Sequence, residues 1–209
     1  DAACGWAGQR CMAGSTAVLS GKAADRLTNP LSEIVSKIQV GPTDRGSGGT
    51  MGAVISPAHR DRVGQLLESG VRDGAELLID GRGVDVPEEP NGFYMGPSIL
   101  DRVESGMEIA REEVFGPVLN LMRFDDLEAA IDLANNTPFG NGACIYTQSG
   151  SAAREFKHRI KAGMVGINVG VPAPLAYFPF SGWDYSFFGD LHLQGRESVL
   201  FYTRHKVTT

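Results

Sequence analysis

The chain has 209 residues and a formal net charge of −6, with 42% hydrophobic and 21% charged residues. These ordinary values predict a globular protein with a sizeable core, in one large domain or one and a half small ones. No basic cluster is present, which argues against nucleic acids and anionic membranes as partners. The three cysteines form no Cys-x-x-Cys pair, so a disulfide framework is not expected and a reducing compartment such as the cytoplasm is favoured.

Short β-prone runs alternate with amphipathic runs along the chain, with apolar side chains at helical spacing in the latter. Strands are predicted at 15–20, 76–80, 94–100, 118–124, 143–146 and 164–169. Helices are predicted from Pro30, with Asn29 as the cap, and from Ser56-Pro57, Asp125 and Ser151. A helical turn is also expected over 107–113. This alternation predicts an α/β fold with a largely parallel open sheet flanked by helices.

Three local patterns need interpretation. Asp125-x-x-Glu128 resembles a capping box with Asp as the cap. The glycine-rich segment 41–52, with Gly46-Ser47-Gly48-Gly49, lacks the Lys-Ser/Thr of a P-loop, so we expect a surface connection. The longest uncharged run, 162–181, contains three prolines and several glycines, which makes it a poor membrane span.

Cys11 is the residue with the most distinctive chemistry in the chain. It follows a glycine-led turn and precedes the small residues 13–15, which leave room for a ligand to approach the thiol. A neighbouring cation such as Arg10 and a nearby helix N-terminus would lower a thiol pKa and favour the nucleophilic thiolate. The alternative, a small apolar side chain packed under a loop, stays open at this point.

Two motifs resemble the signatures of the aldehyde dehydrogenase family. Gly8-Gln9-Arg10-Cys11-Met12-Ala13 is similar to its nucleophile motif, and Glu112-Glu113-Val114-Phe115-Gly116-Pro117-Val118 is similar to its second signature. Their order and separation make the resemblance specific, and it covers essentially the whole chain. The methylmalonate-semialdehyde dehydrogenase branch is resembled in particular, by the variant Gly-Gln-Arg-Cys-Met-Ala of the first motif and by residues 178–183 and 186–190.

The resemblance implies roles for four residues. Cys11 would be the catalytic nucleophile; Glu113 would bind the nicotinamide ribose hydroxyls of NAD, and Phe115 would lie near the nicotinamide. Arg10 would bind the carboxylate of a semialdehyde substrate. Two plainer interpretations remain open: Glu112 and Glu113 as a solvated acidic pair, and Arg10 as a group that only lowers the thiol pKa.

For the whole protein, the resemblance implies an NAD-dependent enzyme that passes a cysteine thioester to coenzyme A as co-substrate, giving propionyl-CoA or acetyl-CoA. The alternatives are a hydrolytic aldehyde dehydrogenase with another substrate, and a non-catalytic oligomerisation or binding module with the same fold. In the family the domain that binds most of NAD precedes the nucleophile, and only ten residues precede Cys11 here. That domain is therefore expected to be absent from this chain, which by itself would be inactive.

The remaining expectations concern domains and weaker sites. We predict a catalytic domain at 1–185, a connection at 186–200 and a C-terminal β-strand at 201–209 through which copies form a homo-oligomer. His59 and Arg62 fall near the family's ribose contact, but a solvated helix face is favoured for both. The aromatic residues Phe178, Phe180 and Trp183 are expected in the core, with the lining of a substrate tunnel as the alternative. The four histidines show no metal-binding spacing, so no metal is expected.

Overall fold

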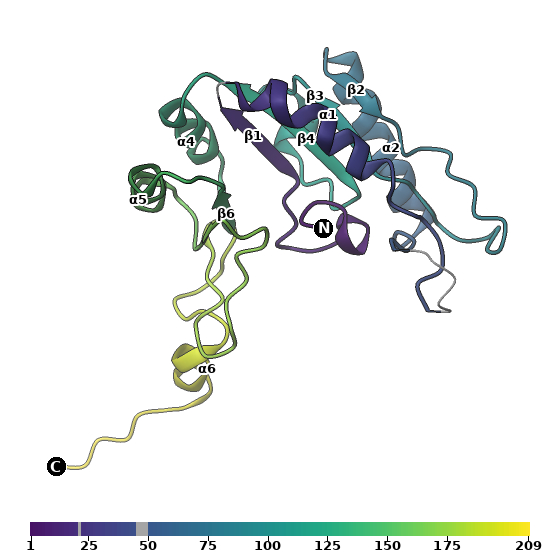
Figure 1. Ribbon diagram of the computed structural model, residues 1–209. Coiled ribbons are helices and arrows are strands. Elements are labelled where there is room, and N and C mark those ends of the chain that lie inside the picture. Colours follow the sequence, from purple (N-terminus) through teal and green to yellow (C-terminus); the bar gives the residue numbers. More distant parts are fainter. Residues whose placement is uncertain (21, 45–49) are drawn as a thin grey trace. The chain divides into compact units, whose positions relative to one another are not determined.

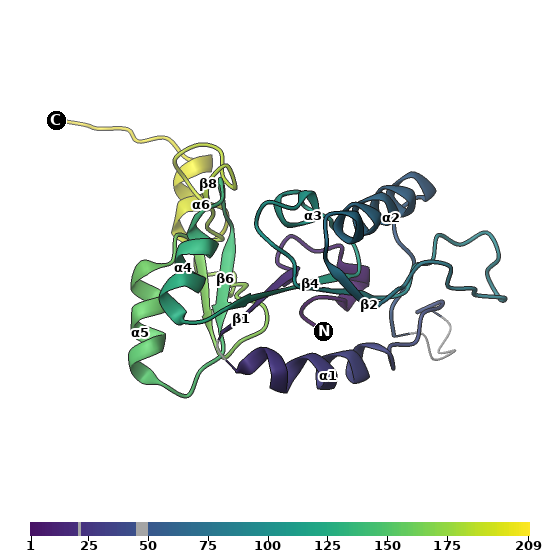
Figure 2. The same ribbon diagram turned by 90° about the horizontal axis from the view of Figure 1, so that it is seen from above.

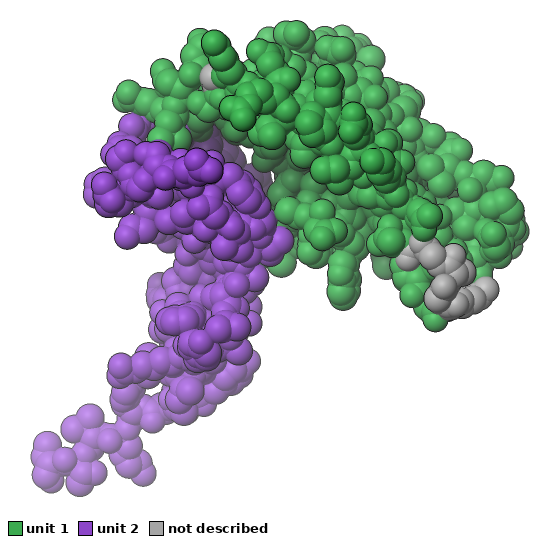
Figure 3. Space-filling view, in the orientation of Figure 1, with its two compact units in different colours: residues 1–130 green, residues 131–209 purple. Residues whose placement is uncertain are grey.

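The structure, a computed structural model, describes residues 1–20, 22–44 and 50–209 (Figure 1). Gly46–Gly49 of the glycine-rich segment thus lie outside the described residues. The chain forms two compact units, residues 1–130 and 131–209, which Figure 3 colours separately. The predicted division at residues 185 and 200 stays a prediction.

The first unit contains a four-stranded sheet and its covering helices. Its elements are η1 (Gly5–Gly8), β1 (Thr16–Ser20), α1 (Ala23–Val35), α2 (Pro57–Arg72), β2 (Glu76–Ile79), β3 (Ser98–Asp101), α3 (Glu108–Arg111) and β4 (Val118–Phe124). The strand order is β1-β4-β3-β2; β1, β4 and β3 are parallel, and β2 is antiparallel to β3. The predicted α/β fold with a largely parallel sheet is therefore confirmed.

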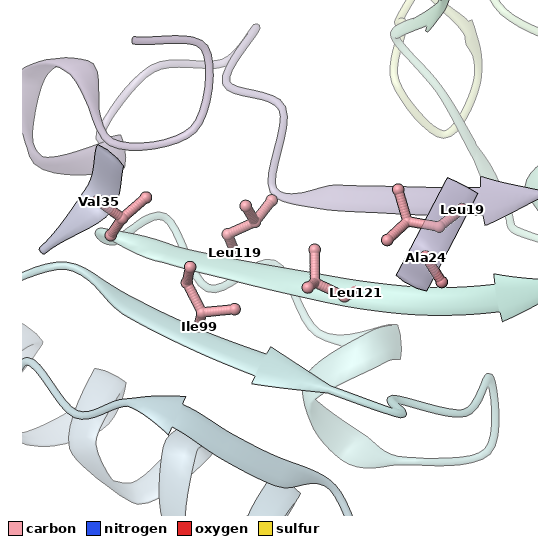
Figure 4. Packing of buried hydrophobic residues seen from close by; sticks show 6 residues of the cluster. All are labelled: Leu19, Ala24, Val35, Ile99, Leu119 and Leu121. Carbon is pink, nitrogen blue, oxygen red and sulfur yellow. The ribbon is translucent and has the colours of Figure 1, made fainter. Parts of the chain in front are cut away.

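The sheet of this unit lies between two helices. Figure 2 shows α1 on one face and α2 on the other. Alternate side chains of a strand point to opposite faces, so Leu119 and Leu121 of β4 both face α1. They belong to a buried apolar cluster (Figure 4) that consists of Leu19, Ala24, Val35, Ile99, Leu119 and Leu121.

The pairing of β1 with β4 places two distant segments side by side. Thr16 is in register with Asn120, and the Asn120 amide donates to the Ser15 carbonyl at 2.9 Å. Because the strands are parallel, the segments that enter them, 5–15 and 112–117, reach the same edge of the sheet. The buried Asn120 side chain also donates from Nδ2 to the Ile109 carbonyl at 3.1 Å, which ties α3 to the sheet beneath it.

Two predicted helix starts were wrong. α1 begins at Ala23, seven residues before Pro30, and Pro30 lies inside it. A proline inside a helix lacks one hydrogen-bond donor, but packing of Ala24 and Val35 on the sheet stabilises the helix despite that loss. In α4 (Leu127–Asn135), which spans the boundary of the units, the cap is Asp126, whose carboxylate accepts from the Ala129 amide at 2.8 Å.

The second unit contains the end of α4, two further helices and short strand pairs. Its remaining elements are β5 (Phe139–Gly140), β6 (Gly142–Ile145), α5 (Gly150–Arg159), β7 (Met164–Ile167), β8 (Trp183–Asp184) and α6 (Gly195–Tyr202). β6 and β7 are parallel, and β5 and β8 are antiparallel. The predicted strands near 143 and 164 and the helix between them are confirmed, with Ser149 capping α5 by accepting from the Ala152 amide at 3.2 Å.

The predicted C-terminal strand is not present in this unit. Phe201 and Tyr202 end α6, and residues 203–209 are neither helix nor strand. A strand needs a partner for its backbone groups, and a single copy of the chain offers none to this tail. The strand as an oligomerisation element stays a prediction. Among the described residues, no helix is both long and apolar enough to cross a membrane.

An ion pair joins the ends of β3 and β4. The buried Asp101 carboxylate accepts from the Arg123 Nε at 3.1 Å and from the Arg102 amide at 2.7 Å. Burial acts to raise the pKa of Asp101, but the bonds from Arg123 and Arg102 outweigh it and hold the pKa below its usual value. The pair therefore stabilises the fold above the ordinary aspartate pKa, and this contribution is lost as pH falls through the lowered value.

Asp101→Asn is expected to lower the free energy of unfolding at pH 7 by about 2–3 kcal/mol, because it leaves the Arg123 guanidinium without its buried partner. Urea unfolding at pH 7 and at pH 3 measures this, and the deficit relative to wild type should shrink at pH 3. Glu76→Gln, which removes an exposed pair with Arg102, is the control and should change stability by less than about 1 kcal/mol. An Asp101→Asn deficit that is the same at both pH values would contradict the prediction.

Candidate active site

Cys11 lies in the loop between η1 and β1, and its side chain is exposed. The other two cysteines are less accessible: burial raises the pKa of the Cys4 thiol and that of Cys144, outweighing smaller opposing effects from the chain N-terminus and the Gly166 amide. The alternative that the sequence left open, a Cys11 side chain packed under a loop, is therefore wrong, since Cys11 is exposed.

The turn before Cys11 has an unusual backbone. Trp6, Ala7 and Gly8 have φ values of 58°, 53° and 68°, all in the left-handed region. Each such non-glycine residue costs about 1–2 kcal/mol, so surrounding contacts must hold the turn in place. One contact is Gln9, whose Oε1 accepts from the Ile55 amide at 2.9 Å, at the entrance to α2.

The nucleophile loop meets the second motif through its backbone. A Cβ added at Gly8 would lie 2.0 Å from the Gly116 carbonyl oxygen and 3.0 Å from the Pro117 nitrogen. No side chain fits at such a distance, so Gly8 is required both for its φ and for this approach. The structure thus brings the two motifs together, which the resemblance implied.

The second motif presents two side chains outward. Glu113 is exposed, and Phe115, at φ 52°, is 38% exposed, while Val114 between them is buried. A bulky residue in the left-handed region is rare and marks a strained position. A carboxylate and an aromatic ring are thereby presented from a backbone that lies against the nucleophile loop.

His59 and Arg62, on the first turns of α2, hold this backbone. The His59 Nε2 lies 2.7 Å from the Phe115 carbonyl oxygen, and Arg62 donates from Nη1 and Nη2 to the carbonyls of Val114 and Glu113 at 3.1 and 2.9 Å. Arg62 is exposed, as the predicted solvated face implies, and His59 is half-buried, but both side chains also bond to this backbone. Their spacing of three residues places both side chains on one side of α2, and this is the sequence signal that could have linked them.

Arg10 is directed toward the start of the chain. Its Nη2 donates to the carbonyls of Asp1 and Ala2 at 2.6 and 3.0 Å, and its guanidinium lies against Gly5. A guanidinium carries five N–H donors, so these bonds use part of its capacity. Its predicted contact with a substrate carboxylate stays a prediction.

The aromatic residues predicted in the core are placed differently. Phe178 is 55% exposed and Trp183 is 47% exposed, so neither is a core residue. Phe180 is half-buried, and its amide donates to the Leu193 carbonyl at 2.7 Å. In the part of the chain that the structure describes, no three His, Cys, Asp or Glu side chains are arranged to hold a metal ion.

A profile of the aldehyde dehydrogenase family matches residues 1–208. The chain belongs to the aldehyde dehydrogenase family. It is 47% identical over its whole length to malonate-semialdehyde dehydrogenase 2 of Geobacillus kaustophilus and spans 43% of that relative. Among aldehyde dehydrogenases of known structure, it is 44% identical to methylmalonate-semialdehyde dehydrogenase from Oceanimonas doudoroffii, with a TM-score of 0.94 over 97% of this chain and 42% of that one.

A second solved relative carries NAD. The structure of a methylmalonate-semialdehyde dehydrogenase from Sinorhizobium meliloti, described as complexed with NAD, is 41% identical and superimposes with a TM-score of 0.92. The superposition covers 97% of this chain and 42% of that one. This aldehyde dehydrogenase chain therefore spans less than half the length of these relatives.

Gly8→Ala is expected to destabilise the chain by about 2–4 kcal/mol and to displace Cys11, because the new Cβ overlaps the Gly116 carbonyl in a left-handed turn. Thermal unfolding and the rate at which a disulfide reagent modifies Cys11 measure the two effects. Gly14→Ala is the matched control: it lies outside the left-handed region, and its added Cβ comes no closer than 3.8 Å, to the Ala2 Cβ. Equal behaviour of the two variants would refute the proposed role of Gly8.

Proposed function

We propose that the complete gene product oxidises a semialdehyde with NAD and that Cys11 is its nucleophile. The observation that carries this proposal is the exposed Cys11 thiol on a loop fixed, through Gly8 and Gly116, against the segment that presents Glu113 and Phe115. An aldehyde held beside the thiol would thus also lie beside residues suited to a nicotinamide nucleotide.

The chemistry follows from the thiol. The Cys11 thiolate adds to the aldehyde carbon and forms a thiohemiacetal, whose oxyanion the Cys11 backbone N–H can stabilise. When the oxyanion re-forms a carbonyl, the carbon loses its hydrogen as hydride and a thioester to Cys11 remains. NAD, when bound, would supply the acceptor for this hydride.

Glu113 and Phe115 suit the nicotinamide end of NAD. An exposed carboxylate can accept two hydrogen bonds from the vicinal hydroxyls of a ribose, and a partly exposed ring can cover one face of a flat heterocycle. We propose that most of the NAD contacts come from the part of the relatives' length that this chain does not span, since the chain spans 43% of one of them.

The substrate and the acyl acceptor are inferred from the relatives. Their names specify malonate and methylmalonate semialdehydes, so we infer an aldehyde that carries a carboxylate. We further propose that coenzyme A takes the acyl group from Cys11, with loss of that carboxylate as carbon dioxide, to give acetyl-CoA or propionyl-CoA. Analysis of the products with and without coenzyme A distinguishes this from hydrolysis.

Arg10 is proposed to bind the substrate carboxylate. Its guanidinium neighbours Cys11 in sequence, and two of its five N–H donors are engaged with the carbonyls of Asp1 and Ala2. Those bonds orient the guanidinium beside the nucleophile loop, where a carboxylate could complete its hydrogen bonding.

The C-terminal tail is proposed to join copies of the protein into a homo-oligomer. Helix α6 and this tail expose several large apolar side chains, namely Val199, Phe201, Tyr202 and Val207, which are 62%, 65%, 84% and 85% exposed. Apolar surface of this kind is typical of a segment that is covered by a partner.

Cys11→Ser in the complete gene product is expected to lower NADH production from malonate semialdehyde by at least about 1,000-fold, because a hydroxyl is a far weaker nucleophile here. NADH absorbance and acyl-CoA formation are the measurements. Cys144→Ser serves as the control and should keep both activities. Comparable activity in Cys11→Ser would refute the proposed function.

Arg10→Leu is expected to lower kcat/KM for a carboxylate-bearing semialdehyde about 10- to 100-fold more than for an uncharged aldehyde of similar size. The comparison between substrates separates carboxylate binding from the loss of the bonds to Asp1 and Ala2, which would affect both. Arg10→Lys keeps the positive charge but lacks the paired N–H donors of a guanidinium, so it should recover only part of the kcat/KM lost on the carboxylate-bearing substrate. An equal loss on both substrates would rule out the role in carboxylate binding.

A further inference from the structure

We propose that His59 and Arg62 are positioning residues that hold the backbone of Glu113–Phe115, and so fix where the Glu113 carboxylate and the Phe115 ring are presented. This inference rests on the proposed function, because it assigns those two side chains to the nicotinamide nucleotide. The role of His59 and Arg62 would be exerted through the main chain of the second motif.

The contacts form a continuous series along three consecutive carbonyls. Arg62 donates to Glu113 and Val114 at 2.9 and 3.1 Å, and the His59 Nε2 contacts the next carbonyl, that of Phe115, at 2.7 Å. The His59 Nε2 can donate to the Phe115 carbonyl in the neutral Nε2–H tautomer and in the charged imidazolium. Each peptide group that could rotate between Glu113 and Phe115 is thus held by a side chain of α2.

The backbone of Glu113–Phe115 is not stabilised by regular secondary structure. It follows the four-residue α3, and its ladder pairing begins only at Val118, so the backbone between them has no regular partner strand. Phe115 is also in the left-handed region, at φ 52°, where a bulky residue is disfavoured. Bonds from outside the segment are therefore needed to keep Phe115 in this conformation.

α2 is suited to this role because it contacts both the second motif and the nucleophile loop. Ser56 caps its first turn by accepting from the His59 amide at 3.1 Å, and the buried Val63 lies against Gly116, whose added Cβ would be 2.8 Å from the Val63 Cγ2. Gln9 of the nucleophile loop accepts from Ile55, just before the cap, at 2.9 Å. A shift of α2 would therefore move both motifs together.

The first test uses the chain itself and needs no cofactor. In Arg62→Gln and His59→Phe, amide hydrogen exchange over residues 112–118 is expected to quicken about tenfold or more, and the rate of Cys11 modification by a disulfide reagent should change. His59→Gln retains a side-chain N–H donor and should restore most of the protection. Arg60→Gln is the matched control, since the Arg60 guanidinium on the same helix contacts Asp61.

The second test is a double-mutant cycle in the complete gene product. Arg62→Gln is expected to lower kcat/KM for NAD roughly 10- to 100-fold, because small misplacements of binding groups are costly. If Arg62 acts through Glu113, adding Arg62→Gln to Glu113→Gln should cost little more than Glu113→Gln alone. Arg62→Lys, which cannot bridge two carbonyls with a planar fork, should recover only part of the loss.

The outcomes separate the two proposals. Unchanged exchange and thiol reactivity in Arg62→Gln and His59→Phe would overturn the positioning role, and so would losses that multiply in the double variant, which indicate direct cofactor contact. Absence of NADH production by the wild type with every aldehyde would refute the proposed function. In that case the exchange measurement alone would still decide how His59 and Arg62 act on the segment.

Discussion

The backbone contact between Gly8 and Gly116 is the constraint on which the candidate site depends. With 2.0 Å between an added Gly8 Cβ and the Gly116 carbonyl oxygen, the two main chains are in direct contact, and no side chain can separate them. Gly8 lies three residues before the nucleophile, and Gly116 lies three residues after Glu113. The position of Cys11 relative to the second motif is therefore set by backbone packing, which is stiffer than contact between long side chains.

The sheet makes this contact possible. Each motif directly precedes a strand, the first β1 and the second β4, and the two strands are parallel neighbours. Parallel neighbours begin at the same edge, so this pairing, which the sequence did not predict, brings the motifs together, whereas the two strands themselves were predictable. The α/β fold, β4 and the cap at Ser56 were likewise predictable, because they rest on local pattern and capping chemistry.

Other features depended on packing that local signals do not contain. Pro30 reads as a helix start, yet burial of α1 on the sheet carries the helix through it. The bonds from His59 and Arg62 to residues more than fifty positions away could not be predicted from the sequence of α2 alone. The C-terminal strand was predicted from β-propensity, but a strand also requires a partner, and propensity does not supply one.

The site is held mainly by main-chain groups, and this determines what its side chains can do. The left-handed turn at Trp6 and Ala7, the Gly8–Gly116 approach and the carbonyls of Glu113–Phe115 all fix backbone, while Cys11 and Glu113 themselves are exposed. A scaffold that used those side chains for packing would bury them and close them to a ligand, and burial also raises the pKa of a thiol, as it does for Cys4. Strain in the turn and at Phe115 is thus the consequence of holding Cys11 and Glu113 at the surface in fixed positions relative to each other. The hydrogen bonds from α2 and Gln9 stabilise this strained backbone.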